Sequence, residues 1–272
     1  MNQSPTTPLI LITNDDGIRS TGLLAAAEAC IGLGDLLIAA PAQQQSAVGR
    51  AKPPSSSGRI FTEQLRIDGV QMIGYAIEAT PAQVVEHALV ELADRTPALV
   101  VSGINFGENI GEGITTSGTV GAALEAASFE VPALAVSLQS DPQHYFTHDA
   151  DLDFLTAAHF VRQLAQAILR HGLPPGVDLL KLDVPSHATP ATPLRWTRLS
   201  RQRYFYPVAR ARQALSDPAP LDFVTRADPA TLEPDSDVRA VAVDQVISVT
   251  PLVRDLSATI AEQRLVAWLD GE

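Results

Sequence analysis

The sequence has 272 residues, of which 46% are hydrophobic and 18% are charged, as expected for a folded globular chain. Its 19 basic and 31 acidic residues give a net charge of −12, which excludes the basic surface that duplex nucleic acid requires. No segment approaches the roughly 18 consecutive apolar residues of a membrane helix. The single cysteine, Cys30, excludes a disulfide framework. Because residues 1–8 are polar and unlike a signal peptide, we expect a cytoplasmic protein with no membrane partner.

The N-terminal part of the sequence predicts a strand, a helix and a second strand. Residues 9–13 are apolar and β-branched, as in a strand that is buried on both faces, and they end at the turn-forming run Asn14–Gly17. Residues 22–33 are rich in alanine and leucine and predict a helix, and residues 36–40 predict a second buried strand. Such a unit implies parallel strands joined by a right-handed crossover.

The same alternation of strands and helices continues to residue 185. Residues 42–58 predict a polar loop, and Asp68-Gly69 lies between two strand-like runs, residues 59–67 and 70–75, as in a hairpin. The remaining elements predicted in this part are a helix that opens at Thr80-Pro81, a strand at 98–102, a helix at 118–128, a strand at 132–137, a helix at 151–169 and a strand at 179–184.

After Pro185 the sequence loses its periodicity. Residues 186–236 are rich in proline, arginine and aromatic residues, and we expect an arm whose exposed aromatic side chains pack on a second subunit. A strand at 246–250 and a helix at 255–269 should follow. We therefore predict an α/β fold, with a Rossmann-like, doubly wound and mostly parallel sheet in residues 1–185 and a C-terminal extension in residues 186–272. The aromatic residues of the expected arm are Trp196, Tyr204, Phe205 and Tyr206.

Polar side chains follow three of the predicted parallel strands, at the sheet edge where ligands bind. Asp15 and Asp16 follow the first strand, Ser46 lies in the loop after the second, and Asn105 and Asn109 follow the third. Two adjacent carboxylates repel each other, and a divalent cation with oxygen ligands would relieve that repulsion. A solvated turn that caps the next helix would explain the same pair, so the spacing alone leaves both interpretations open.

A second candidate site lies where a glycine-rich loop enters the helix predicted at 118–128. The free N–H groups of a helix start, together with the hydroxyls of Ser117 and Thr119, suit a phosphate group. A helix cap with small residues for close packing would explain them equally well. The sequence has no Walker A motif, no dinucleotide fingerprint and no Gly-x-Ser-x-Gly elbow.

Taken together, these motifs resemble the SurE survival protein family. The strongest signal is the combination of Asn14-Asp15-Asp16-Gly17 after the first strand with Ser102-Gly103-Ile104-Asn105 after the third. The matching segments are Leu11–Gly17, Ala40-Pro41 with Ser46, Val101–Asn105, Gly107–Gly111, Ser117–Glu125, Pro132–Ser137 and Ser248–Leu252.

The resemblance implies a metal-dependent phosphatase that hydrolyses nucleoside 5′-monophosphates, a 5′-nucleotidase, with some members also taking 3′-monophosphates or short polyphosphate. It implies one divalent ion per subunit, Mn²⁺ or Mg²⁺, with Ca²⁺ as an ion found in crystals. It also implies assembly into homodimers or homotetramers through the C-terminal arm. Either Asp15 or Asp16 would orient the attacking water. By position, the metal ligands would be Asp15, Asp16, Ser46 and Asn105, and the phosphate contacts would be Asn109, Ser117, Gly118 and Thr119.

The loop around Ser46 departs from the family pattern. It reads Ala42-Gln43-Gln44-Gln45-Ser46-Ala47, where the family usually has an acid after the proline and a glycine after the serine. This difference keeps open a catalytically weakened, nucleotide-binding member of the same fold. A metal-dependent glycosyltransferase is a further alternative, although the adjacent aspartates fit its Asp-x-Asp arrangement poorly. Release of inorganic phosphate separates the phosphatase from both.

Overall fold

A central sheet organises the molecule. The computed structural model describes residues 7–141, 152–258, 264, 268 and 269. In this part of the chain, nine strands form one sheet in the order β3-β4-β2-β1-β5-β6-β7-β11-β8, and β9 and β10 pair separately. The strands are β1 (Leu9–Thr13), β2 (Asp35–Pro41), β3 (Ile60–Ile67), β4 (Val70–Ile77), β5 (Leu99–Phe106), β6 (Ala133–Leu138), β7 (Leu179–Val184), β8 (Leu194–Trp196), β9 (Phe205–Val208), β10 (Asp222–Thr225) and β11 (Ile247–Leu252).

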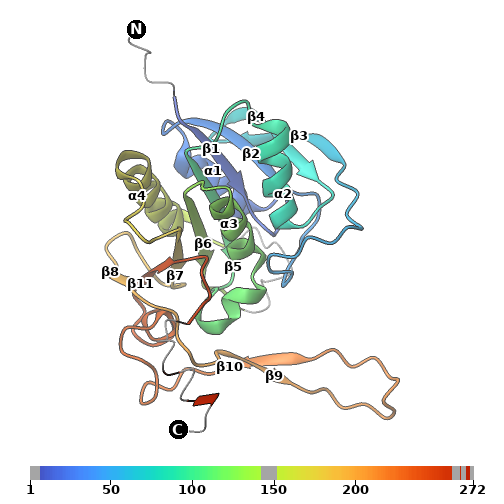
Figure 1. The fold of residues 1–272 in the computed structure, drawn as a ribbon, viewed down its shortest axis with the longest axis vertical. Coiled ribbons are helices and arrows are strands. Elements are labelled where there is room, and N and C mark those ends of the chain that lie inside the picture. Colours follow the sequence, from blue (N-terminus) through green and yellow to red (C-terminus); the bar gives the residue numbers. More distant parts are fainter. Residues whose placement is uncertain (1–6, 142–151, 259–263, 265–267, 270–272) are drawn as a thin grey trace.

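Helices cover both faces of the sheet (Figure 1). They are α1 (Thr21–Cys30), α2 (Pro81–His87), α3 (Gly118–Ser128) and α4 (Leu155–His171), with short helical turns at Ala88–Leu92, Gly111–Thr116 and Arg239–Val243.

The sheet is parallel from β4 through β7, and β3 and β11 run antiparallel to their neighbours β4 and β7. Strand β1 lies between β2 on one side and β5 on the other, so the strand order reverses at β1. This arrangement confirms the predicted doubly wound, mostly parallel α/β fold, and it places the expected ligand site at the carboxyl ends of β1 and β5.

Two apolar clusters sandwich the sheet, because successive side chains of a strand point to opposite faces. Ile10 and Ile12 of β1 pack in a cluster that includes residues of α1 and α4. Leu9 and Leu11 pack in a second cluster that includes residues of α2 and α3. All five residues of β1 are buried, as expected for a strand covered on both faces.

Several element ends differ from the sequence prediction by a few residues, and three of these differences have a clear structural reason. Helix α1 ends at Cys30 rather than residue 33, because Ile31 already has an extended backbone. Strand β5 continues to Phe106 instead of ending at Ser102, since its pairing with β6 shifts register between Ser102 and Asn105 and then resumes. Helix α4 begins at Leu155, whose N–H donates to the Asp153 carboxylate (2.8 Å).

The C-terminal extension contains more regular structure than its sequence predicts. Residues 186–236 include β8, which joins the main sheet, and the antiparallel pair β9–β10. This pair leads into a long arm at the bottom of Figure 1. The strand predicted at 246–250 is β11, inserted between β7 and β8. The helix predicted at 255–269 falls mainly outside the described residues, and residues 255–258 are not helical.

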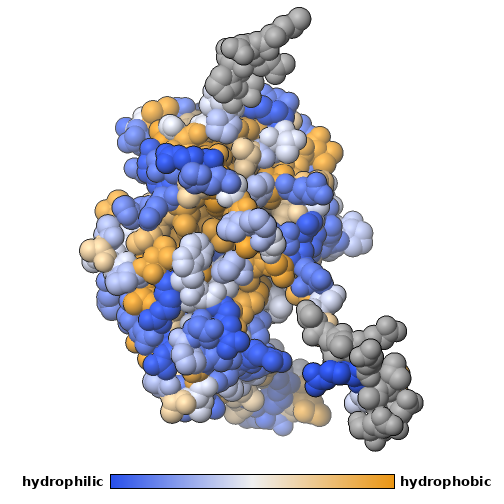
Figure 2. Space-filling view, turned by 60° about the vertical axis from the view of Figure 1, so that its left-hand side comes forward, coloured by the Kyte–Doolittle hydropathy of each residue, from blue (hydrophilic) through white to orange (hydrophobic). Residues whose placement is uncertain are grey.

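The surface beside α4 mixes hydrophilic and hydrophobic residues (Figure 2). Helix α4 itself buries one side, including Phe160, Val161 and Leu164, and exposes the other, as expected for a helix at the boundary of a globular core. Among the described residues, no helix is both long and apolar enough to cross a membrane.

Candidate active site

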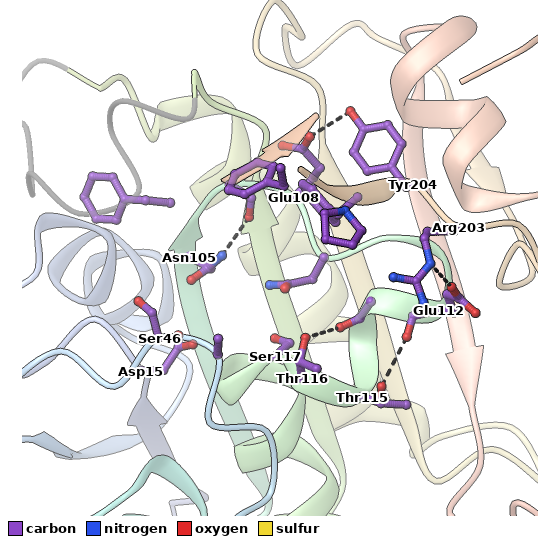
Figure 3. A pocket seen from close by; sticks show the side chains of 18 of the residues that line it. Asp15, Ser46, Asn105, Glu108, Glu112, Thr115, Thr116, Ser117, Arg203 and Tyr204 are labelled. Atoms are coloured by element: carbon purple, nitrogen blue, oxygen red, sulfur yellow. Dashed lines mark hydrogen bonds and ion pairs between the residues drawn. The ribbon is translucent and has the colours of Figure 1, made fainter. Parts of the chain in front are cut away.

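A cavity of about 650 Å³ lies at the carboxyl ends of β1 and β5, where the reversal of strand order predicts a ligand site. One side is formed by the loops that follow these strands and by the start of α3. The opposite side is formed by residues of and next to β9 and β10 (Figure 3). Its volume is within the range usual for small-molecule sites. The predicted residues among its lining are Asp15, Asp16, Ser46, Asn105, Asn109 and Ser117.

A tight turn after β1 directs the two aspartates. The Asn14 side chain accepts a hydrogen bond from the Gly17 N–H (3.0 Å) and donates one to the Gly17 carbonyl (3.1 Å). Gly17 has φ of +99°, and an added Cβ would lie 3.3 Å from the Pro41 carbonyl oxygen. Glycine is therefore required here both for its backbone conformation and for its small size.

Asp15 is buried against the start of α3. Its carboxylate accepts hydrogen bonds from the Thr119 hydroxyl (2.6 Å) and from the backbone N–H groups of Gly118 and Thr119. A Cβ at Gly118 would lie 2.7 Å from both Cβ and Oδ2 of Asp15, so only glycine permits this approach. Burial raises the pKa of Asp15 above its ordinary value, and these hydrogen bonds partly oppose the rise.

Asp16 is also buried and lies beside Asp15. It accepts hydrogen bonds from Nε2 of Gln44 (3.1 Å) and the backbone N–H of Phe106 (3.4 Å). Burial, followed by repulsion from the Asp15 charge, raises the pKa of Asp16 well above its usual range. Among the described residues, no lysine, arginine or histidine forms an ion pair with Asp15 or Asp16. Within the described part of the chain, the pair therefore has no counter-charge.

Asn105 and Ser46 add two neutral oxygen donors beside the aspartates (Figure 3). Nδ2 of Asn105 donates to the Gly107 carbonyl (2.7 Å), which leaves its Oδ1 as an acceptor toward the cavity. Ser46 is exposed in the loop after β2. Two carboxylates, an amide oxygen and a hydroxyl form a hard donor set that fits Mg²⁺ or Mn²⁺. No group of three or more His, Cys, Asp or Glu residues in the described chain offers a competing metal site.

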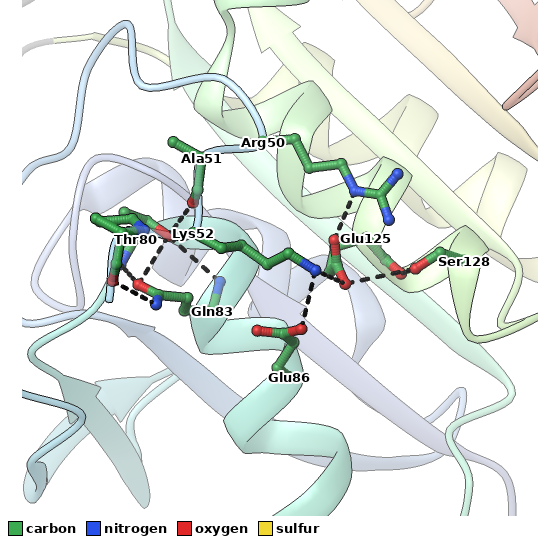
Figure 4. A network of polar contacts seen from close by, with 9 residues as sticks. Arg50, Ala51, Lys52, Thr80, Gln83, Glu86, Glu125 and Ser128 are labelled. Atoms are coloured by element: carbon green, nitrogen blue, oxygen red, sulfur yellow. Dashed lines mark hydrogen bonds and ion pairs between the residues drawn. The ribbon is translucent and has the colours of Figure 1, made fainter. Parts of the chain in front are cut away.

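The loop that carries Ser46 is held on both sides of that residue. Before it, the Gln45 N–H donates to the Asp15 carbonyl (2.7 Å), and after it, the Gly49 N–H donates to the Thr116 carbonyl (2.8 Å). Further along, the loop is tied to α3 and α2 (Figure 4). The long polar loop is thus fixed to the same elements that hold the aspartates.

The main tie to α3 is the carboxylate of Glu125, whose side chain is only 2% exposed. It accepts from Nε of Arg50 (2.5 Å) and lies 3.3 Å from Nζ of Lys52. At the N-cap of α2, the Thr80 hydroxyl donates to the Ala51 carbonyl (2.6 Å). The sequence matched Glu125 only as part of a motif, and nothing in the spacing linked it to Arg50, 75 positions away.

The residues expected at the phosphate divide into two pairs. Asn109 and Ser117 line the cavity, and Ser117 also caps α3 by accepting the Val120 N–H (3.1 Å). Gly118 and Thr119 do not line it, and Thr119 is fully buried. Since both contact Asp15, the structure gives them a supporting position behind the carboxylate rather than a place at the cavity wall.

A fully buried charged cluster connects the core to the extension. Lys181 of β7 pairs with Asp183 and lies 3.2 Å from Asp237 of the extension. Burial alone would lower the pKa of Lys181, but the two carboxylates outweigh it and raise that pKa above its ordinary value. Asp183 accepts the N–H of Asn109 (2.8 Å), and Asp237 accepts the N–H of Gly111 (3.0 Å). The cluster therefore anchors the loop that lines the cavity.

The far wall of the cavity comes from the extension, whose sequence predicts contacts between subunits. Tyr204 is buried, and its hydroxyl donates to Glu108 (2.9 Å). Phe205 is half-buried against Tyr204 and Phe223, with ring centroids 4.7 and 5.4 Å apart. The expectation that all four aromatic residues are exposed was therefore wrong for Tyr204, which is buried, and for Phe205 and Tyr206, which are half-buried, whereas Trp196 is exposed. The non-local pairing of β9 with β10 turns Phe205 inward, which no local pattern signals.

Known proteins share both the sequence and the fold. A family model described as "Survival protein SurE" matches residues 10–206. A 5′-nucleotidase SurE of Thermococcus kodakarensis is 40% identical, over 92% of this chain and 94% of its own. One from Methanocella arvoryzae is 41% identical, over 94% and 97%. The crystal structure of the SurE protein from Aquifex aeolicus has a TM-score of 0.75 at 26% identity and covers 97% of this chain and 100% of its own.

Proposed function

This chain belongs to the SurE survival protein family, and from that premise we infer that it is a 5′-nucleotidase. The reaction releases inorganic phosphate from a nucleoside monophosphate by attack of water on phosphorus. Catalysis of such a reaction rests on positioning the water and on stabilising negative charge at the phosphoryl oxygens.

The charge of the cavity supports a requirement for a divalent cation. Five carboxylates line its described wall, and its single lining arginine, Arg203, is already 3.1 Å from Glu112. An anionic phosphate would be repelled by this wall. We propose that Asp15, Asp16, Ser46 and Asn105 hold one Mn²⁺ or Mg²⁺ ion. When bound, the ion supplies the missing positive charge and makes a water molecule more acidic. The lining carboxylates are those of Asp15, Asp16, Glu108, Glu112 and Asp222.

The residues around the aspartates have separable roles in this proposal. Asp16 has fewer described hydrogen bonds than Asp15, which favours Asp16 as the residue that orients the attacking water. Thr119 and Gly118 fix Asp15 from behind. Ser117 and Asn109 donate to the phosphate from the cavity wall, with the hydroxyl proton of Ser117 and the second amide proton of Asn109 serving as donors.

One observation favours a second candidate, a nucleotide-binding protein with weakened catalysis. Gln44 stands in the loop that usually carries an acid, and its amide donates to Asp16 (3.1 Å). This contact would compete with a cation for the same carboxylate.

Phosphate release decides between the two. The substrates are nucleoside 5′- and 3′-monophosphates and short polyphosphate, each with Mn²⁺, Mg²⁺ or EDTA. Metal-dependent release that is lost in Asp16→Asn is the result expected of the phosphatase. Tight nucleotide binding by folded protein without release under any condition would establish the binding protein instead.

We further propose a homodimer or homotetramer that assembles through the arm. Leu215 and Leu221, between β9 and β10, are 92% and 65% exposed, and burying such side chains against a second copy would stabilise the assembly. Light scattering should give the mass of a dimer or tetramer, and Leu215→Ser with Leu221→Ser should lower it.

Cys30, buried and without a disulfide, is compatible with the reducing cytoplasm, where we place the enzyme.

A further inference from the structure

The far end of the cavity presents an apolar surface from the arm, in which the rings of Phe205 and Phe223 meet edge to face at 85°. Phe205 and Pro207 of β9 and Phe223 of β10 line the cavity. Phe223 is paired directly opposite Pro207, so these two side chains share one face of the ribbon, and Phe205 lies two residues from Pro207 on the same face. We call these three residues the arm platform.

The neighbouring side chains of the same two strands lie on the other face. Tyr206 and Val224 are paired opposite each other, and neither lines the cavity. Tyr206 instead contacts the Arg226 guanidinium, 4.6 Å from its ring centroid. The alternation of the ribbon therefore separates a cavity-facing aromatic surface from an outer one.

The polar groups around the arm platform are engaged with other parts of the protein. Arg203 pairs with Glu112 (3.1 Å), Tyr204 donates to Glu108 (2.9 Å), and Asp222 accepts from Arg210 (2.6 Å). A hydrogen-bonding code for one nucleobase would need donors and acceptors directed at the base edge. The surface offered here is mainly the rings of Phe205 and Phe223.

From this arrangement we propose that the arm platform binds the nucleobase of the substrate by stacking, with little regard to which base it is. This inference rests on the proposed function and deepens it. Every base has a π-face, so an aromatic surface accepts all four, whereas a phosphate ester without a base gains nothing from it. The enzyme should therefore prefer nucleoside monophosphates to sugar phosphates and should favour the larger purines slightly over pyrimidines.

The test compares three phosphate esters in one enzyme. The value of kcat/KM is measured for AMP, CMP and ribose 5-phosphate with Mn²⁺. Phe223→Ala should lower the value for AMP by about 5- to 150-fold, mainly through KM, and should leave that for ribose 5-phosphate unchanged. Phe223→Tyr, which keeps the ring, should behave like the wild type.

Val224→Ala is the matched control, because Val224 is adjacent to Phe223 and similarly exposed, 42% against 38%, but lies outside the cavity lining. This variant should leave kcat/KM unchanged for AMP and for ribose 5-phosphate. Light scattering on each variant verifies that the assembly is unchanged. If Phe223→Ala lowered kcat/KM equally for AMP and ribose 5-phosphate, or lowered it for neither, the proposed role of the arm platform in stacking would be refuted.

A failure of the proposed function looks different. In that case the wild type releases no phosphate from any of the three esters. The arm platform then retains a readout of its own, since calorimetry should still show AMP binding more tightly than ribose 5-phosphate, with the difference lost in Phe223→Ala. Equal affinity of the wild type for both esters would refute stacking whether or not the protein is a phosphatase.

Discussion

The two ends of the cavity are built from different parts of the chain and in different ways. The end that holds Asp15 and Asp16 lies on buried strand ends of the core, with backbone and side-chain bonds fixing each carboxylate. The opposite end lies on a two-stranded ribbon, and all four residues of β10 are exposed. Reacting groups must be held within a fraction of an ångström, whereas a stacking surface tolerates variation. The difference suggests that chemistry is fixed by the core and substrate range by the arm.

The largest effect on stability is expected where the two regions meet. Lys181→Met would leave Asp183 and Asp237 buried without their cation, and we expect the free energy of unfolding to fall by about 3–5 kcal/mol. Urea denaturation measures this. Lys181→Arg keeps the positive charge, so its free energy of unfolding should fall by less than that of Lys181→Met. Arg198→Met removes only an exposed pair with Asp235 and should unfold like the wild type. Wild-type stability in Lys181→Met would mean that the cluster does not hold the regions together.

The next effect concerns the core end alone. Asp15→Asn should reduce metal-dependent phosphate release by about 100- to 1000-fold, because a group that organises charge at the reacting phosphate is lost. Calorimetry should show weaker Mn²⁺ binding in the same variant. Asp68→Asn, in the exposed β3–β4 turn, is the control. Full rate together with full metal affinity in Asp15→Asn would refute the proposed ligand set.

A smaller effect is expected at Thr119, and it distinguishes a residue that positions Asp15 from one that contacts the phosphate directly. Thr119→Val keeps the shape of the side chain but removes the hydroxyl that donates to Asp15. Groups that orient metal ligands typically change affinity or activity about 10- to 100-fold, so Mn²⁺ affinity should fall within that range. Thr119→Ser retains the hydroxyl and should stay near the wild type. A change in KM for nucleotide at unaltered Mn²⁺ affinity would instead make Thr119 a phosphate contact.

The smallest effect is expected in the loop of Ser46. Glu125→Gln removes the charge that holds Arg50 and Lys52, and we expect a loss of about 1–2 kcal/mol in stability. Hydrogen exchange in residues 43–52 should quicken, and Mn²⁺ affinity should decrease. Glu86→Gln removes only the more exposed partner of Lys52 and provides the control. If hydrogen exchange in residues 43–52 were unchanged in Glu125→Gln, the remaining hydrogen bonds of the loop would be enough to hold it in place.

Local sequence determined much of the architecture of this protein. The apolar run of residues 9–13, the turn at Asn14–Gly17 and the hairpin at Asp68-Gly69 all have the predicted form. They could be predicted because burial on both faces and turn conformation select residue types over a few neighbouring positions. The four expected metal ligands could be placed near one another because parallel strands bring their carboxyl ends to one sheet edge.

Tertiary structure alone decided which groups support that site and what faces it. The bond from Thr119 to Asp15 spans 104 positions, and the tie from Arg50 to Glu125 spans 75. The inward turn of Phe205 depends on the pairing of β9 with β10 across the arm. Such contacts join segments whose local patterns are independent of one another, so no periodicity records them. The sequence therefore determined the elements and the residues proposed to react, and only their packing determined the supports of the carboxylates and the aromatic wall opposite them.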